Sequence, residues 1–170
     1  MVIAPSLADR YIAAYMAFLG TLVSEPEKAG KRPSQWLVIG RARYVADRAT
    51  LAAYRAQHPQ ADAEMLEAIA ALQVLDWCYL RDTSSYSVLL AGDGSAAHGV
   101  LGLTERLRDV MGCSGRMFRT GLLPIRGRWV CDGLMEGDVL IGKQLRQDLN
   151  AQYQALRQAG RFSTGPDRAA

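Results

Sequence analysis

The sequence has few cysteines and histidines, and their spacing argues against the common disulfide and metal arrangements. Three cysteines, at positions 78, 113 and 131, cannot all pair within one chain, and no Cys-x-x-Cys motif occurs. Secreted disulfide scaffolds carry an even set of cysteines, and structural zinc sites need clustered thiols and imidazoles. His58 and His98 lie far from every cysteine in the sequence. Reduced thiols are therefore expected, and no metal site is predicted.

Long apolar runs, targeting signals and phosphate loops are also missing. The apolar runs span a handful of residues, whereas a helix that crosses a bilayer needs roughly 20. The N-terminus, residues 1–6, has no basic region followed by an apolar stretch. No glycine-rich segment matches a nucleotide-binding pattern. We therefore expect a cytoplasmic protein with no membrane partner and no cofactor.

The 170 residues are 49% hydrophobic and 22% charged, a composition typical of a soluble globular protein. A chain of this length is about the size of one domain. We predict a single α+β domain over residues 1–162, with a helical part at 6–72 and a sheet part at 73–160. Residues 163–170 contain nothing to bury, and they are predicted to form a flexible tail.

The first part of the chain has helical periodicity. Apolar residues such as Tyr11, Tyr15 and Phe18 recur at three- and four-residue spacing after Ser6. A proline-containing loop follows, and a second helix is predicted from Pro33 to about residue 57. A third begins after residue 62. The pattern predicts an N-terminal segment of three helices.

From residue 74 to residue 133 the periodicity changes to short apolar strands separated by turns that contain glycine. Three strands, a short helix after Thr104 and two further strands give the order βββ-α-ββ. Successive hairpins predict an antiparallel sheet of about five strands. A C-terminal helix over about 143–159, with Leu149 and Tyr153 on its apolar face, is expected to pack on this sheet.

Aromatic residues are concentrated in the predicted strands, at Trp77, Tyr79, Tyr86, Phe118 and Trp129. Aromatic surface of this kind requires cover from the helices or from a second copy of the sheet. The leading interpretation is therefore a non-catalytic binding protein. We expect it to form a homo-oligomer and to bind another protein or a small molecule.

An alternative interpretation is a hydrolase or transferase that uses Cys113 as its nucleophile. Glycines at 112 and 115 would let the backbone approach a substrate closely. His98 is the candidate base, and Asp132 could orient it. Nothing in their spacing requires these residues to meet, and each also has a purely structural interpretation: Cys113 as a small apolar residue, His98 as a strand residue and Asp132 as a turn former.

Arginines near the predicted sheet suggest a binding site. Arg81, Arg119 and Arg128 could hold a carboxylate or a phosphate through paired hydrogen bonds. A solvated sheet face, on which acidic residues neutralise these arginines, is the competing interpretation.

The N-terminal region suggests a second alternative, because residues 1–60 carry eight Lys or Arg against four Asp or Glu. Arg41, Arg43, Arg48 and Arg55 in the second helix could contact backbone phosphates. The basic excess is small for a dedicated DNA-binding domain, and no helix-turn-helix pattern occurs. Nucleic acid is therefore not the expected partner.

Overall fold

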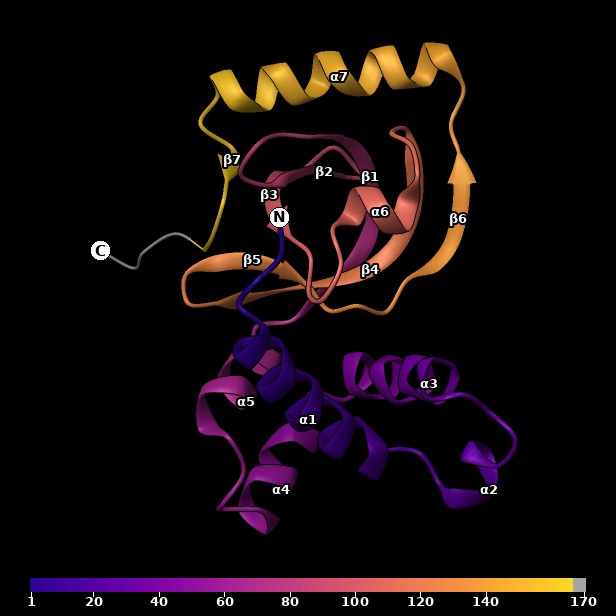
Figure 1. Cartoon of the computed structure of the whole chain (residues 1–170), viewed down its shortest axis with the longest axis vertical. Helices are drawn as coiled ribbons and strands as arrows, with labels where there is room; N and C mark the ends of the chain where they lie inside the picture. The colour runs from indigo at the N-terminus through magenta and orange to yellow at the C-terminus, as the bar shows by residue number, and fades with distance from the viewer. Residues whose placement is uncertain (167–170) are drawn as a thin grey trace. The chain divides into compact units, whose positions relative to one another are not determined.

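The computed structural model describes residues 1–166 as a mixed α/β protein with seven helices and one seven-stranded sheet (Figure 1). The chain divides into two compact units. One is the helical unit, Ala4–Leu72. The other, here called the barrel unit, contains Met1–Ile3 and the chain from Gln73 onward. Within the described part of the chain, no helix is both long and apolar enough to cross a membrane.

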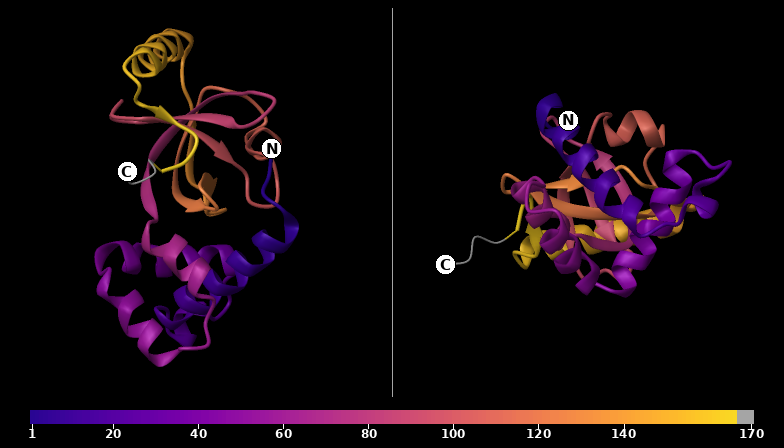
Figure 2. Two further views of the ribbon diagram at one scale, coloured as in Figure 1. Left: turned by 90° about the vertical axis from the view of Figure 1, so that its left-hand side faces the viewer. Right: turned by 90° about the horizontal axis from the view of Figure 1, so that it is seen from below.

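The helical unit contains α1 (Pro5–Thr21), α2 (Glu25–Lys28), α3 (Pro33–Ala46), α4 (Ala49–Gln57) and α5 (Ala63–Ala70). The apolar stripe expected in the first helix is buried, as Tyr11 and Phe18 show. Helix α1, drawn in indigo in Figure 1 and Figure 2, packs against α3 and α5. Helices α1 and α3 approach closely at Gly40, where a Cβ atom would lie 2.8 Å from the carbonyl oxygen of Leu19.

The helical segment is more divided than the sequence predicted. The second predicted helix, which was to reach residue 57, is interrupted between α3 and α4. Asp47 ends α3, and its carboxylate accepts the backbone N–H of Ala49 at 3.0 Å, while its carbonyl accepts the Thr50 hydroxyl at 2.7 Å. Local hydrogen bonds of this kind compete with continuation of the helix. Helix α2 is a further short turn with Glu27 in a capping box at Ser24.

Five strands of the barrel unit form a closed ring: β1 (Gln73–Asp82), β2 (Ser87–Ala91), β3 (Ala97–Leu101), β4 (Arg116–Ile125) and β5 (Arg128–Cys131). Their order is β1-β2-β3-β5-β4, and β4 also pairs with β1. The β3–β5 pairing is parallel, and the other pairings in this ring are antiparallel. A mostly antiparallel sheet was predicted correctly, but ring closure and the parallel pair were not.

The remaining elements of the barrel unit are α6 (Leu107–Met111), β6 (Glu136–Leu140), α7 (Lys143–Gln158) and β7 (Phe162–Ser163). Strand β6 pairs with β4, and β7 pairs in parallel with β3. Neither strand was predicted. The sequence placed the start of a flexible tail at residue 163, whereas the structure has Thr164 accepting the backbone N–H of Trp129 at 3.0 Å. Residues 167–170 of that expected tail lie outside the described residues.

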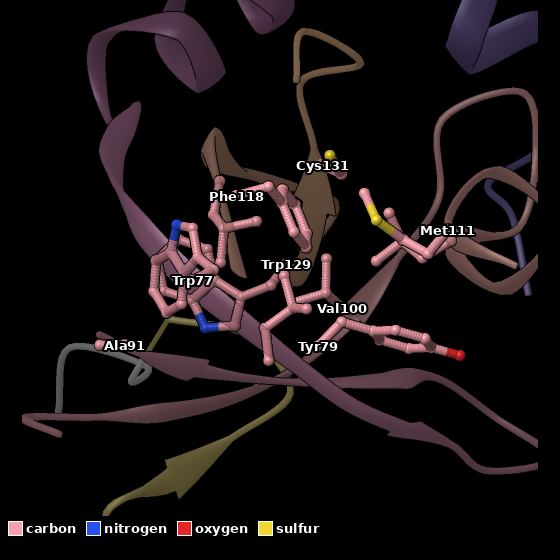
Figure 3. Packing of buried hydrophobic residues seen from close by; sticks show 11 residues of the cluster. Trp77, Tyr79, Ala91, Val100, Met111, Phe118, Trp129 and Cys131 are labelled. Carbon is pink, nitrogen blue, oxygen red and sulfur yellow. The ribbon is translucent and has the colours of Figure 1, made fainter. Parts of the chain in front are cut away.

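Side chains alternate between the two faces of each strand, and apolar residues on both faces give the barrel an inner and an outer apolar layer. Trp77, Phe118 and Trp129 belong to the inner core of the ring, and Figure 3 shows their side chains grouped together. The outward-facing Cys78 and its neighbours form a second cluster that α7 covers with Leu149, Tyr153 and Leu156. Most of the aromatic residues that prompted the expectation of self-association thus lie inside the barrel, and self-association stays a prediction.

Candidate functional site

One end of β1, helix α6 and the loop after α6 line an open pocket of about 360 Å³, here called the Arg81 pocket. The strand contributes Tyr79, Arg81 and Asp82, the helix contributes Arg108, and the loop contributes residues 112–114. The pocket thus contains Arg81 from the predicted ligand-binding set and Cys113 from the predicted catalytic set. These two residues lie far apart in the sequence, and the fold brings them to one cavity.

The carboxylate of Asp82 is fixed by two hydroxyl groups. Tyr79 donates its phenolic proton to Oδ1 of Asp82 at 2.9 Å, and Ser87 donates its hydroxyl to the same oxygen at 2.6 Å. Asp82 and Ser87 are paired across β1 and β2, so strand register places them together. Burial raises the pKa of Tyr79, and its hydrogen bond to Asp82 raises the pKa further. Tyr79 therefore keeps its proton and stays a donor to Asp82.

The loop that carries Cys113 is tied to β1 by its backbone. Gly112 ends α6 with φ of 72°, and Gly115 adopts φ of 79°, conformations that favour glycine. The N–H of Gly115 donates to the carbonyl of Tyr79 at 2.8 Å. These constraints hold Cys113 at the surface, where its side chain is exposed.

The thiol of Cys113 has a basic neighbour, Arg116. The pKa of Arg116 is raised first by its hydrogen bond to Asp138 and then by a side-chain hydrogen bond to Cys113. Arg116 also forms an ion pair with Asp138. The guanidinium beside the thiol is therefore already engaged by a carboxylate.

Two other guanidinium groups give the pocket its charge. Within residues 1–166, neither Arg81 nor Arg108 has an ion-pair partner. Arg81 lies over the ring of Tyr153, 5.1 Å from its centroid, which leaves its hydrogen-bonding groups uncommitted to a carboxylate. The pocket thus presents two cations and the one fixed carboxylate of Asp82.

His98 and Asp132, the other members of the predicted catalytic set, have different surroundings. The centroid of the His98 ring lies 5.6 Å from that of Trp77 and 5.0 Å from that of Trp129. Its Nδ1 atom lies 3.0 Å from the hydroxyl oxygen of Ser163. Asp132 is 2% exposed and accepts the N–H of Leu134 at 3.0 Å. The structure gives Cys113, His98 and Asp132 different neighbours, and their catalytic grouping stays a prediction.

The other two arginines of the predicted ligand-binding set lie on other strands. Arg119, on β4, forms an ion pair with Asp76 at 3.3 Å. Arg128, on β5, has a buried Nε atom without a hydrogen-bond partner among the described residues. Of the three, Arg81 is the one that lines the pocket with Cys113.

The arginines predicted as phosphate contacts are engaged within the helical unit. Arg41 is 1% exposed. Arg43 donates to Glu27 through Nη2 at 2.5 Å and Nη1 at 3.0 Å. The pKa of Glu27 is lowered to about 2, first by the hydrogen bond from Arg43 and then by those from Ser24. Neither arginine is presented as an isolated cation.

Arg48 and Arg55, the other two arginines predicted as phosphate contacts, are also engaged within the helical unit. Arg48 donates to the carbonyl of Leu72 at 2.9 Å and lies 4.4 Å from the centroid of the Tyr44 ring. Arg55 forms an ion pair with Glu67 at 3.0 Å. The basic excess of this region therefore contributes to the packing and charge pairing of the unit itself.

Sequence reasoning missed Tyr79 and Arg108 as site residues. Tyr79 was assigned to the aromatic surface of a strand, and no local signal distinguishes Arg108 from other exposed arginines.

In the part of the chain that the structure describes, no group of three or more His, Cys, Asp or Glu side chains is placed to hold a metal ion. Comparison with known proteins found no matching family model, no matching curated protein and no matching solved structure.

Proposed function

We propose that this is a non-catalytic binding protein whose Arg81 pocket takes a small anionic molecule. The observation that carries the proposal is the pair of guanidinium groups, Arg81 and Arg108, at one cavity, neither of which has an ion-pair partner among residues 1–166. An arginine binds a carboxylate or a phosphate through two parallel hydrogen bonds. A cavity of about 360 Å³ is of the size that takes a small ligand.

The neighbouring carboxylate narrows the chemistry of the ligand. Asp82 is an acceptor fixed by Tyr79 and Ser87. A ligand whose acidic group meets the arginines would therefore gain a second contact if it carried a hydroxyl or amino group that donates to Asp82. Malate and phosphoserine are simple molecules with such a combination, and they serve as probes.

The fold gives independent support for a site at this end of β1. A five-stranded barrel is also the architecture of the OB-fold, in which ligands contact the face of strands two and three and the loops after the first and the fourth strands. Here α7 covers the outer side of β1, β2 and β3 through Leu149, Tyr153 and Leu156. The loop end of β1 remains available. This support is an analogy of fold and assigns no ligand.

Isothermal titration calorimetry with malate, phosphoserine and inorganic phosphate tests the proposal. We expect Arg81→Gln and Arg108→Gln each to weaken the binding of at least one probe by about tenfold or more. Arg106→Gln is the matched control, because Arg106 is also exposed and lies outside the pocket. The proposal fails if no probe binds at millimolar concentration, or if all three variants lose affinity equally.

A cysteine-dependent hydrolase or transferase is the second candidate, because the exposed thiol of Cys113 lies in the same pocket. If the protein is non-catalytic, iodoacetamide should alkylate Cys113 at pH 7 at the rate of an ordinary exposed thiol. A rate about ten times higher, lost in His98→Asn, would favour the enzyme instead. Mass spectrometry of the alkylated peptide identifies the thiol that reacts.

Self-association in the cytoplasm completes the proposed role. It is supported by exposed apolar side chains on the barrel unit, among them Leu140 and Leu145. Light scattering at micromolar concentration should show a mass above that of one chain. A monomer under these conditions would remove this part of the proposal and leave the ligand site untouched.

A further inference from the structure

Strand β1 contains an extra residue where it reaches the Arg81 pocket. Its pairing with β2 joins Tyr79 to Leu89, Arg81 to Val88 and Asp82 to Ser87, so two steps along β1 match one step along β2. Side chains alternate between the faces of a regular strand, and residues three positions apart therefore point in opposite directions. The extra residue cancels this alternation and places Tyr79 and Asp82 on one face. Bulges of this kind re-aim side chains beside binding sites.

The bulge leaves one oxygen of Asp82 available to a ligand. The hydroxyls of Tyr79 and Ser87 both donate to Oδ1, at 2.9 and 2.6 Å. Ser87 is 1% exposed, so the position of its hydroxyl is set by packing. Within residues 1–166, Oδ2 of Asp82 takes part in no hydrogen bond or ion pair. Two donors thus fix the carboxylate through one oxygen, and the other oxygen can accept a donor in the pocket.

Opposite charges lie around the pocket without neutralising each other. Burial raises the pKa of Tyr79 most, its hydrogen bond to Asp82 adds to the rise, and the charge of Arg108 opposes it, so Arg108 lies near this pair. Among the described residues, neither Arg108 nor Arg81 forms an ion pair with Asp82. Asp109 follows Arg108 on α6 and does not line the pocket, and helix side chains one position apart do not face each other.

An unpaired cation and an unpaired anion at one cavity are complementary to a ligand that carries both charges. In an α-amino acid the ammonium and the carboxylate are joined to a single carbon atom. One such molecule can therefore meet Arg108 and Asp82 together, and hydrogen bonds between charged groups are stronger than neutral ones. A ligand whose only charges are carboxylates would satisfy the arginines and would be repelled by Asp82.

We propose that the Arg81 pocket takes an α-amino acid with an acidic side chain. The ammonium group donates to Oδ2 of Asp82, the α-carboxylate binds Arg108, and the side-chain acid binds Arg81. Asp82 determines the specificity, and Tyr79 and Ser87 are positioning residues that hold its carboxylate. This inference rests on the proposed function, and it narrows the anionic ligand to one that also carries a positive charge.

Isothermal titration calorimetry at pH 7 with L-glutamate and glutarate tests the inference, because glutarate has the same carbon chain and both carboxylates but no ammonium group. We expect glutamate to bind about tenfold or more tightly than glutarate. In Asp82→Asn the two affinities should lie within about threefold of each other, because the amide attracts the ammonium less and no longer repels glutarate. Asparagine keeps an oxygen that accepts the hydroxyls of Tyr79 and Ser87.

Two further variants separate direct contact from other effects. Ser87→Ala should reduce the preference for glutamate by about threefold, because Asp82 then has one hydroxyl less to hold it. Asp109→Asn is the matched control, since it removes the same charge beside Arg108 but outside the pocket. It should leave the ratio of the two affinities unchanged. Circular dichroism of each variant confirms that it is folded.

The possible failures are distinguishable. Equal affinity for glutamate and glutarate, with both weakened in Arg108→Gln, would overturn this inference and leave the proposed anion site intact. An equal loss of the preference in Asp82→Asn and Asp109→Asn would also overturn it, because the preference would then reflect the general field of the protein. If glutamate, glutarate, malate, phosphoserine and phosphate all fail to bind at millimolar concentration, the proposed function falls together with the inference.

Discussion

At the residue scale, Asp132 illustrates a polar side chain whose surroundings indicate a structural role. Its Oδ1 atom lies 3.0 Å from the Thr120 hydroxyl and 3.0 Å from the N–H of Leu134, in a region excluded from water. The Thr120 hydroxyl can also donate to the carbonyl of Leu134, at 2.9 Å, so Asp132→Ala would chiefly leave the buried N–H of Leu134 without this acceptor. We expect the free energy of unfolding, measured by urea denaturation, to fall by about 1–3 kcal/mol. Asp132→Asn keeps an acceptor and should cost less, whereas an unchanged midpoint in Asp132→Ala would contradict this role.

Cys78 makes stability depend on pH in the alkaline range. Burial raises the pKa of its thiol from 9.0 to about 11. Below pH 9 the thiol is protonated in the folded and the unfolded chain, so it has no effect there. Between pH 9 and 11 the unfolded chain loses the proton first, and folding is disfavoured by up to about 2–3 kcal/mol.

Urea denaturation at several pH values between 8 and 10 measures this slope below the range in which tyrosine titration dominates. The slope should be smaller in Cys78→Ala, whatever the effect of that variant on stability at pH 8. Equal slopes in the two proteins would show that the Cys78 thiol does not control the alkaline loss of stability.

At the element scale, we expect Gly→Ala substitutions at two positions on facing helices to change stability in opposite directions. Gly40→Ala places a Cβ atom 2.8 Å from the backbone of Leu19, so α1 and α3 must separate, and we expect a loss of about 1–3 kcal/mol. At Gly20, on α1, a Cβ atom would have no neighbour closer than a ring carbon of Trp36 at 3.8 Å. Gly20→Ala should therefore stabilise the helix by up to about 1 kcal/mol. Thermal unfolding of both variants measures the contrast, and changes of the same sign would refute it.

The elements that could be predicted are those whose signal is local. Helix α1 shows its buried stripe directly in the sequence, and the hairpin of β2 and β3 is marked by Asp93 and Gly94. Strand β6 was missed because Gly137 and the acids around it resemble a turn, and it depends on β4 for its backbone partners. The break after α3 depends on two local hydrogen bonds of one residue, Asp47, one to its side chain and one to its carbonyl. The periodicity of apolar residues indicates neither the backbone pairing of a strand with a remote partner nor the local hydrogen bonds that end a helix.

At the scale of the whole molecule, the candidate site depends on ring closure. Arg81 was a predicted ligand-binding residue because it is one of several arginines near the predicted sheet that could converge on an anion. Arg108 could not be predicted, since it joins the pocket through the long-range pairing of β1 with β4 and the hydrogen bond from Gly115 to Tyr79. Contacts between segments remote in sequence are set by tertiary structure, and a single sequence without repeats or motifs does not reveal them.

The division into two compact units bears on the cooperativity of unfolding. The sequence suggested one domain over residues 1–162, while the contacts of the folded chain group Ala4–Leu72 apart from the barrel unit. If each unit opens by itself, Gly40→Ala should accelerate amide hydrogen exchange in Ala4–Leu72 and leave the barrel strands unchanged.

Asp132→Ala provides the reciprocal experiment, because Asp132 lies in the barrel unit. It should accelerate exchange in β4 and β5 and leave the amides of α1 and α3 unchanged. Hydrogen exchange followed by mass spectrometry resolves the two sets of peptides in a single sample. Acceleration throughout the chain in both variants would show one cooperative domain, because a substitution in either unit would then lower the free energy of the same global opening.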